Sequence, residues 1–384
     1  MKKQIAILLL FSFTSMFAWS QDKYIKTTEP CKDELLLKTP GAWLASSKRY
    51  YTKTTKQELQ QTENRLNTIR QLTQNIYPKP MAFDAVVTYY ASDANFASQI
   101  KIQQTQLGTQ VGFRNSFING IPTILYEYYV KFCAYGCHAR TPNTIVKNPG
   151  CESGPLISVH INGLKIFFWE FHTDDDYVDL MRIEGRPIQL MPVLIGKWKG
   201  YDLYSPQVGS GNKMVLLHRQ GILPYIPVTR KQYLERSIEY IERSLNKTII
   251  PFEKREGLSL MMTNKEEWDA QIKKVEKLRD DILKYYLDEL DATTKAGQLD
   301  SPAIITGDIA DIDTNTPIFT TQDKGGKMLV TENPAYFRKD LPKYVPQLIV
   351  YMWNGEIGPD PIKNPCYVYY QDFPILSLQA MIDK

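Results

Sequence analysis

The chain has 384 residues, of which 43% are hydrophobic and 23% are charged, and its formal net charge is +4. This is the composition of an ordinary globular protein, long enough for one large domain or two medium ones. The positive charge is too small and too dispersed to indicate nucleic-acid binding, since the chain has no basic stripe with interleaved aromatic residues.

Residues 1–20 have the pattern of a secretory signal peptide. Met1–Lys3 form a basic start, Ile5–Ala18 form a short apolar run, and small residues occupy the −3 and −1 positions before Gln21. No later apolar run approaches the ~18 residues of a membrane-spanning helix. The sequence therefore predicts an exported protein without a transmembrane segment, either periplasmic or secreted.

A first helix is predicted after a loop-like stretch at 21–51. Thr55 and Glu58 form a capping box, in which the two residues satisfy each other's backbone groups at the start of a helix. Apolar residues at helical spacing continue to about Ile76, and two prolines follow. The single apolar stripe predicts a surface helix that lies on another part of the protein.

The next part of the chain is rich in β-branched and aromatic residues and predicts a largely antiparallel sheet. The expected strands are 85–90, 123–132, 187–195, 201–205 and 214–219.

The clearest stretch is Leu156–His172, where Asn162-Gly163 separates two apolar runs and predicts a β-hairpin with a type I′ turn. Alternation gives this hairpin an apolar core face and a second face that is polar near the turn, at Ser158 and His160. The open end of the second face carries three aromatic residues: Phe167, Trp169 and Phe171. These rings form either a second core layer under a helix or an exposed platform for a sugar, a peptide or a partner.

Two further capped helices are predicted in the second half. Thr229 and Gln232 form another capping box, and Asn264 caps a longer helix whose apolar stripe reaches Leu290. The two helices are expected to pack antiparallel or to cover one sheet face together. Short strands are expected at 303–306, 328–331, 347–353 and 367–370, before a closing helix at 374–382.

These elements predict an α+β fold, with a mainly antiparallel sheet and covering helices that include the capped pair. Residues 21–228 would hold the N-terminal helix and the β-rich region. Residues 229–384 would hold the helical pair and a smaller α+β region, either separate from the first part or continuous with it.

Five cysteines follow the predicted signal peptide, and export permits disulfides. Cys137 with Cys151 would close a loop of about 15 residues, worth ~3 kcal/mol in the chain-entropy model. Cys133 with Cys137 is the rival pairing, and Cys31 with Cys366 would join the two ends of the chain. The odd number leaves one thiol unpaired.

The catalytic candidates follow the predicted hairpin directly: His172, Asp174 and Asp176. A histidine beside carboxylates at a strand end can orient a general base or bind a cation. The alternative is a solvated turn in which the aspartates cap backbone N–H groups.

Metal-binding candidates lie elsewhere in the chain. A second acidic loop holds three possible ligands: Asp308, Asp311 and Asp313. Their alternation is typical of a calcium loop, although the Gly and Glu that complete an EF-hand are missing, so the alternative is a plain acidic loop. Calcium is the one cofactor that the sequence suggests. A zinc site of Cys133, Cys137 and His138 has a spacing unlike that of familiar zinc fingers.

A second binding candidate is Lys197-Trp198-Lys199 at a predicted turn. The tryptophan between two lysines could contact an anionic glycan or a lipid headgroup. Alternatively, its ring covers the sheet edge while the lysines extend outward.

No H-E-x-x-H, G-x-S-x-G or G-x-G-x-x-G motif occurs in the chain. Together with the aromatic candidates, this favours a non-catalytic, exported binding or envelope-associated protein with a glycan or protein partner. The alternative is an exported hydrolase, metal-assisted or not, that acts on an envelope or extracellular polymer with His172, Asp174 and Asp176 at its centre. A subunit of a surface assembly is a third hypothesis.

Overall fold

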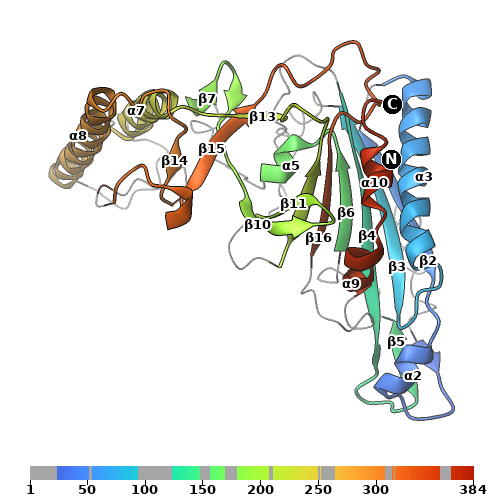
Figure 1. Cartoon of the computed structure of the whole chain (residues 1–384). Helices are drawn as coiled ribbons and strands as arrows, with labels where there is room; N and C mark the ends of the chain where they lie inside the picture. Colours follow the sequence, from blue (N-terminus) through green and yellow to red (C-terminus); the bar gives the residue numbers. More distant parts are fainter. Residues whose placement is uncertain are drawn as a thin grey trace, which may run out of the picture.

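The computed structural model has an α+β fold built on one large, mainly antiparallel sheet (Figure 1). It describes residues 24–51, 54–93, 123–147, 156–168, 180–206, 211–249, 251, 264–307, 314, 316–354 and 365–384. The main strands, in sheet order, are β2 (Trp43–Tyr51), β3 (Phe83–Asp93), β4 (Ile124–Cys137), β6 (Leu156–Ile161), β16 (Ile349–Asn354), β12 (Lys213–Leu217), β11 (Tyr201–Ser205) and β10 (Val193–Trp198). β2 and β3 run parallel, and the other neighbours in this series are antiparallel. The predicted fold class is confirmed.

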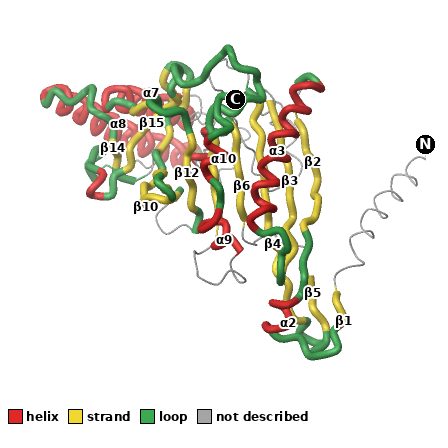
Figure 2. The backbone as a smooth tube through the Cα atoms, turned by 45° about the vertical axis from the view of Figure 1, so that its right-hand side comes forward, coloured by secondary structure: helices red, strands yellow, loops and turns green. Residues whose placement is uncertain are grey.

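At one end, β4 extends beyond its neighbours and carries a small projecting arm (Figure 2). There β5 (Thr144–Lys147) pairs with the last residues of β4, and β1 (Tyr24–Lys26) pairs with β5. The arm also contains α2 (Asp33–Lys38). Because β1, α2 and β2 all lie within 21–51, the prediction of a loop-like stretch there is wrong. β2 is an edge strand without polar–apolar alternation, so its sequence carries little strand signal.

Three helices cover one face of the large sheet: α3 (Lys56–Ile76), α9 (Pro365–Asp372) and α10 (Ile375–Gln379) (Figures 1 and 2). α3 begins at the predicted capping box. The Thr55 hydroxyl accepts the backbone N–H of Glu58 at 3.2 Å, and the Glu58 carboxylate accepts the N–H of Thr55 at 3.1 Å. Apolar side chains of these helices and of alternate strand residues form the main hydrophobic core.

Helix α9 replaces the strand predicted at 367–370, which is wrong. Cys366, Tyr369 and Phe373 recur at helical spacing and are buried in the main core. The Tyr369 hydroxyl donates to the Thr73 carbonyl of α3 at 3.0 Å. The aromatic, β-branched composition favours a strand, but packing beneath α3 selects the helix. The closing helix predicted at 374–382 is present as α10.

A second layer covers part of the other sheet face. It contains α5 (Leu164–Phe168) and a small sheet of β13 (Tyr225–Pro227), β15 (Lys327–Glu332), β14 (Ile304–Ile305) and β9 (Gln189–Leu190), accompanied by the paired β7 (Arg182–Ile183) and β8 (Arg186–Pro187) and by the 3-10 helix η3 (Gln322–Lys324). A second apolar cluster fills the space between this layer and β16, β12 and β11.

The predicted helical pair is α7 (Arg230–Thr248) and α8 (Lys265–Lys295), which lies farthest from the large sheet (Figure 1). The side chains of Thr229 and Asn264 cap the two helices as the sequence predicts. Arg230 at the start of α7 donates to Gln298 just beyond the end of α8, so the helices are antiparallel. Within the described ranges, no helix combines the length and the apolar character needed to cross a membrane.

The hairpin predicted at Asn162-Gly163 is wrong, because the chain passes from β6 into α5. β6 instead pairs with β4 on one side and with β16 on the other. Asn162 is buried, donates to the carbonyls of Ile124 and Val345, and accepts the N–H of Gln347. Its positive φ of 59° therefore serves a buried connection between three backbone segments.

The central position of β16 joins the two halves of the sequence. β16 follows residue 229 but lies between β6 and β12, both of which precede it in the chain. Residues 21–228 and 229–384 therefore share the large sheet.

Candidate functional site

A group of polar side chains lies on the sheet face that α3 does not cover. Alternation along β6 places Ser158 and His160 on this face, while Ile157, Val159 and Ile161 enter the main core. The register with β4 sets Glu127 opposite His160 and Tyr129 opposite Ser158. Ser158, His160, Glu127 and Tyr129 are called the His160 cluster below.

The imidazole of His160 links a hydroxyl to a carboxylate. Its Nε2 lies 2.9 Å from Ser158 Oγ, and its Nδ1 lies 3.2 Å from Glu127 Oε1. The Tyr129 hydroxyl donates to the other carboxylate oxygen, Oε2, at 2.7 Å. The Tyr129 ring also packs edge-on against the imidazole, with 5.2 Å between ring centres. Oε2 of Glu127 is therefore held by a hydrogen bond, and Oε1 lies beside the imidazole.

Within the cluster Ser158 and His160 are buried, whereas Glu127 and Tyr129 are half-buried. The His160 side chain is 2% exposed and the Glu127 side chain 24% exposed. Burial alone would raise the pKa of Glu127, but the hydrogen bond and charge of His160 and the hydrogen bond from Tyr129 outweigh it, so the pKa lies below its ordinary value. Burial and the adjacent carboxylate raise the pKa of Tyr129 well above its ordinary value. At neutral pH, Glu127 is a carboxylate and Tyr129 a hydrogen-bond donor.

A row of aromatic side chains continues from the cluster towards the β2 edge. The Tyr129 ring contacts Tyr90 of β3 edge to face, with 5.5 Å between centres. The guanidinium of Arg49 on β2 lies 5.8 Å from the centre of the Tyr90 ring. Tyr90 and Tyr129 are half-buried, so this face presents aromatic rings beside an accessible carboxylate.

Several residues singled out in the sequence lie outside the described residues. These are the catalytic candidates His172, Asp174 and Asp176, the metal candidates Asp308, Asp311 and Asp313, and the aromatic residues Trp169 and Phe171. In the described part of the chain, no group of three or more His, Cys, Asp or Glu side chains is placed to hold a metal ion.

Phe167 is fully buried on α5. Its ring packs against Tyr204 and Tyr225, with centres 5.0 and 6.4 Å away. For this residue the structure shows the second core layer and not an exposed platform.

Trp198 is also buried, at 4% exposure. It precedes the turn Lys199-Gly200, whose φ angles of 50° and 87° are those of a type I′ hairpin. Its ring stacks on Tyr351, and its N–H donates to the Tyr370 carbonyl at 2.8 Å. The structure therefore agrees with the alternative in which the Trp198 ring covers the sheet, and not with a ring that is exposed to a ligand.

The two lysines beside Trp198 are exposed and have local partners. Lys197 Nζ lies 2.6 Å from an Asp202 carboxylate oxygen. Lys199 Nζ donates to the Phe373 carbonyl at 2.9 Å. A ligand-binding role for Lys197 and Lys199 stays a prediction.

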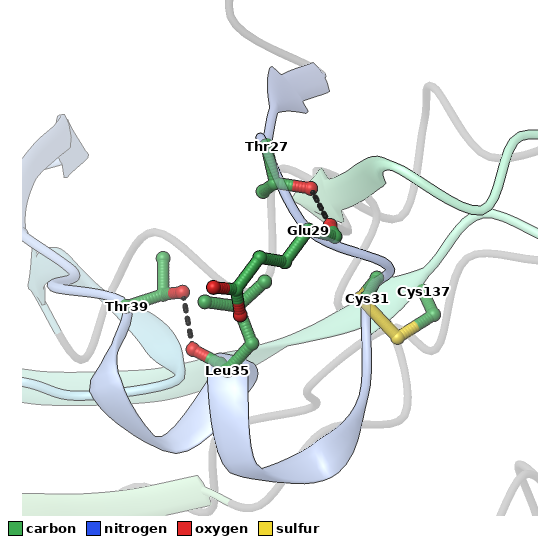
Figure 3. Close-up of a disulfide and its surroundings, with 6 residues drawn as sticks. All are labelled: Thr27, Glu29, Cys31, Leu35, Thr39 and Cys137. Carbon is green, nitrogen blue, oxygen red and sulfur yellow. Dashed lines mark hydrogen bonds between the residues drawn. A yellow bond between two sulfur atoms is a disulfide. The ribbon is translucent and has the colours of Figure 1, made fainter.

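The cysteine pairing differs from the predictions. Cys137 is bonded to Cys31 (Figure 3), and Cys366 is a buried free thiol. The pairings of Cys137 with Cys151 or Cys133 and of Cys31 with Cys366 are therefore wrong, because β1 and β5 bring the N-terminal segment beside the end of β4. Cys133 is also disulfide-bonded. A zinc site of Cys133, Cys137 and His138 is excluded, since neither sulfur is a thiolate.

Sequence reasoning placed Ser158 and His160 on one face but missed Glu127 and Tyr129. The available signal was a glutamate inside a long apolar strand at 123–132, which is unusual where a charged group must leave water. Its position opposite His160 depends on strand order, which no local pattern encodes. Comparison of the chain with protein-family models, curated proteins and solved structures found no match.

Proposed function

We propose that this protein is an exported, periplasmic or secreted binding protein without catalytic activity. Its ligand surface would be the sheet face over β3, β4 and β6. The observation that carries the proposal is the Glu127 carboxylate, which accepts a hydrogen bond from Tyr129 and lies beside His160 yet retains solvent exposure. The signal-peptide pattern of residues 1–20 and the Cys31–Cys137 disulfide support export.

The energetics of the His160 cluster favour a functional role. Hydrogen bonds between largely buried polar side chains contribute little net stability, because removing these groups from water offsets the interactions that they form. Apolar residues at these positions would stabilise the sheet equally well. Titratable groups held in such a setting are candidates for functional sites.

The chemistry of this face suits a ligand rich in hydroxyl groups, such as a glycan. Glu127 can accept hydrogen bonds from hydroxyls, and the rings of Tyr90 and Tyr129 offer apolar surface with polar edges. Because the carboxylate is already oriented, binding would require little reorganisation of the protein.

A thermal-shift screen of the mature, oxidised protein against soluble glycans tests this proposal. A ligand at ~100 times its dissociation constant stabilises the folded state by about 2.7 kcal/mol. We expect a glycan to raise the melting temperature of the wild type and of Glu63→Gln, a control on α3, but not of Glu127→Gln. A glycan that shifts Glu127→Gln as much as the wild type would contradict the assigned surface, and a flat screen would contradict a glycan ligand.

A second candidate function is hydrolysis of an ester, favoured by the chain Ser158–His160–Glu127. A hydroxyl, an imidazole and a carboxylate in this order are the groups that nucleophilic acyl transfer requires. Ser158 would attack the carbonyl carbon while His160 Nε2 takes its proton and passes it to the leaving alcohol. Water would then release the acyl group as a carboxylic acid.

Two features place this candidate second. Ser158 has no exposed surface, and β6 is paired on both sides, so its N–H groups are engaged in the sheet and do not form an oxyanion hole. A fluorophosphonate probe followed by mass spectrometry decides between the two functions. Labelling of Ser158 that is lost in His160→Gln would support hydrolysis, and an unlabelled Ser158 would exclude it.

A further inference from the structure

The projecting arm contains a cleft of about 670 Å³ at the end of β4, beside the Cys31–Cys137 disulfide. Its lining includes Tyr135, Cys137, His138 and Arg140, and none of the lining residues is acidic. A volume of this order is typical of small-molecule sites. Along β4 the cleft lies beyond the segment that carries Glu127 and Tyr129, so it is separate from the His160 cluster.

The orientation of the His138 ring is fixed by its own loop. Nδ1 accepts the backbone N–H groups of Arg140 at 3.2 Å and Thr141 at 3.1 Å. Two donors on Nδ1 leave the proton of the neutral ring on Nε2. No described residue accepts a hydrogen bond from Nε2, so this N–H remains available to a ligand.

Two positively charged side chains lie in or beside the lining of the cleft. Arg140 is exposed, and its guanidinium forms no ion pair with any acidic group in the described part of the chain. Lys147 on the neighbouring β5 places its ammonium 5.6 Å from the centre of the Tyr135 ring. The Tyr135 hydroxyl donates to the buried Asp84 carboxylate, which holds the ring in position.

We propose that this cleft binds the carboxylate group of a small solute, with an acidic monosaccharide as the ligand class. The Arg140 guanidinium and the His138 Nε2–H would hold the anion through charge-assisted hydrogen bonds. The disulfide, at the exposed Cys137, would contact the apolar face of the sugar ring. This site goes beyond the proposed function, and the two can fail independently.

Histidine-selective NMR of the mature, oxidised protein tests this inference, because the chain has only four histidines. The probe is glucuronate, compared with glucose, which lacks the carboxylate, and with sodium chloride at equal ionic strength. The His138 signal is assigned with His138→Gln. We expect glucuronate alone to move this signal while the signal of His160 stays in place.

Two matched charge-removing variants complete the test. Arg140→Gln should raise the dissociation constant for glucuronate, read from the His138 signal, about tenfold or more, as expected for the loss of a hydrogen bond to a charged group. Arg236→Gln removes an exposed arginine from α7 and should leave the response unchanged. The inference is overturned if glucose or salt moves the His138 signal equally, if no probe moves it, or if the two variants behave alike. Unchanged signals of the other histidines in Arg140→Gln would show that the fold is intact.

Discussion

Cys31 and Cys137 lie 106 positions apart in the sequence, yet a disulfide joins them and their Cα atoms are 5.5 Å apart (Figure 3). The bond connects the segment before α2 to the last residue of β4. The backbone N–H of Cys31 also donates to the Pro142 carbonyl at 2.6 Å. The arm is thus held by strand pairing, by a hydrogen bond and by a covalent link.

Removing this disulfide should destabilise the protein strongly. A bond that closes a loop of about 100 residues contributes about 4.7 kcal/mol in the chain-entropy model. We therefore expect the double variant Cys31→Ser, Cys137→Ser to lose several kcal/mol in urea unfolding of the oxidised protein. Replacing both residues avoids a free thiol that could exchange with the bond of Cys133. A loss below about 1 kcal/mol would contradict this account.

Replacing Trp198 should affect stability far more than replacing its neighbour Lys197. Trp198→Ala leaves a cavity against Tyr351 and an unpaired Tyr370 carbonyl, which predicts a loss of about 3–5 kcal/mol. Lys197→Ala removes only an exposed ion pair, worth at most about 1 kcal/mol. Urea unfolding of both variants checks this, and equal stabilities would show that the Trp198 ring does not belong to the core.

Acid should remove the contribution of Glu127 to stability. Because its pKa is lowered in the folded state, this contribution is present above the pKa of the unfolded chain and is lost as pH falls through the folded pKa. The difference in unfolding free energy between wild type and Glu127→Gln should be largest near pH 7 and should shrink below about pH 4.3, the ordinary range of a glutamate. If the difference in unfolding free energy did not change with pH, the negative charge of Glu127 would not contribute to stability.

Two glycines should respond differently to the same substitution. A Cβ at Gly41 would lie 1.7 Å from the Phe83 carbonyl oxygen, whereas a Cβ at Gly136 would meet nothing within 4 Å. Gly41→Ala should therefore cost about 1–3 kcal/mol or more through displaced backbone. Gly136→Ala should stay within about 0.5 kcal/mol of the wild type. Thermal unfolding of the two variants checks whether close packing at Gly41 excludes a larger side chain. Equal stabilities of the two variants would show that it does not.

The features that could be predicted from the sequence are those with local causes. The capped starts of α3, α7 and α8 depend on residues three positions apart, so a short window contains the whole signal. The strand segments β3, β4, β11 and β12 have compositions that suit a half-buried pleated surface. For these elements the local preference and the tertiary structure agree.

The wrong predictions fall where contacts with residues distant in the sequence determine the local structure. Asn162-Gly163 has the composition of a hairpin turn, but both edges of β6 are filled by β4 and β16 and the asparagine is buried. The segment at 367–370 favours a strand until packing beneath α3 is considered. For the same reason only part of the candidate site can be predicted from the sequence. Ser158 and His160 share a strand, whereas Glu127 lies beside them because two distant segments pair.

The central position of β16 determines when the large sheet can form during synthesis of the chain. A ribosome completes β6 and β12 long before it reaches residues 349–354. Until then, each of those strands has one unpaired edge lined by apolar side chains, the kind of surface through which incomplete chains aggregate. The large sheet can therefore close only after nearly the whole chain has been synthesised, and a nascent chain released early would lack the strand that joins its two halves.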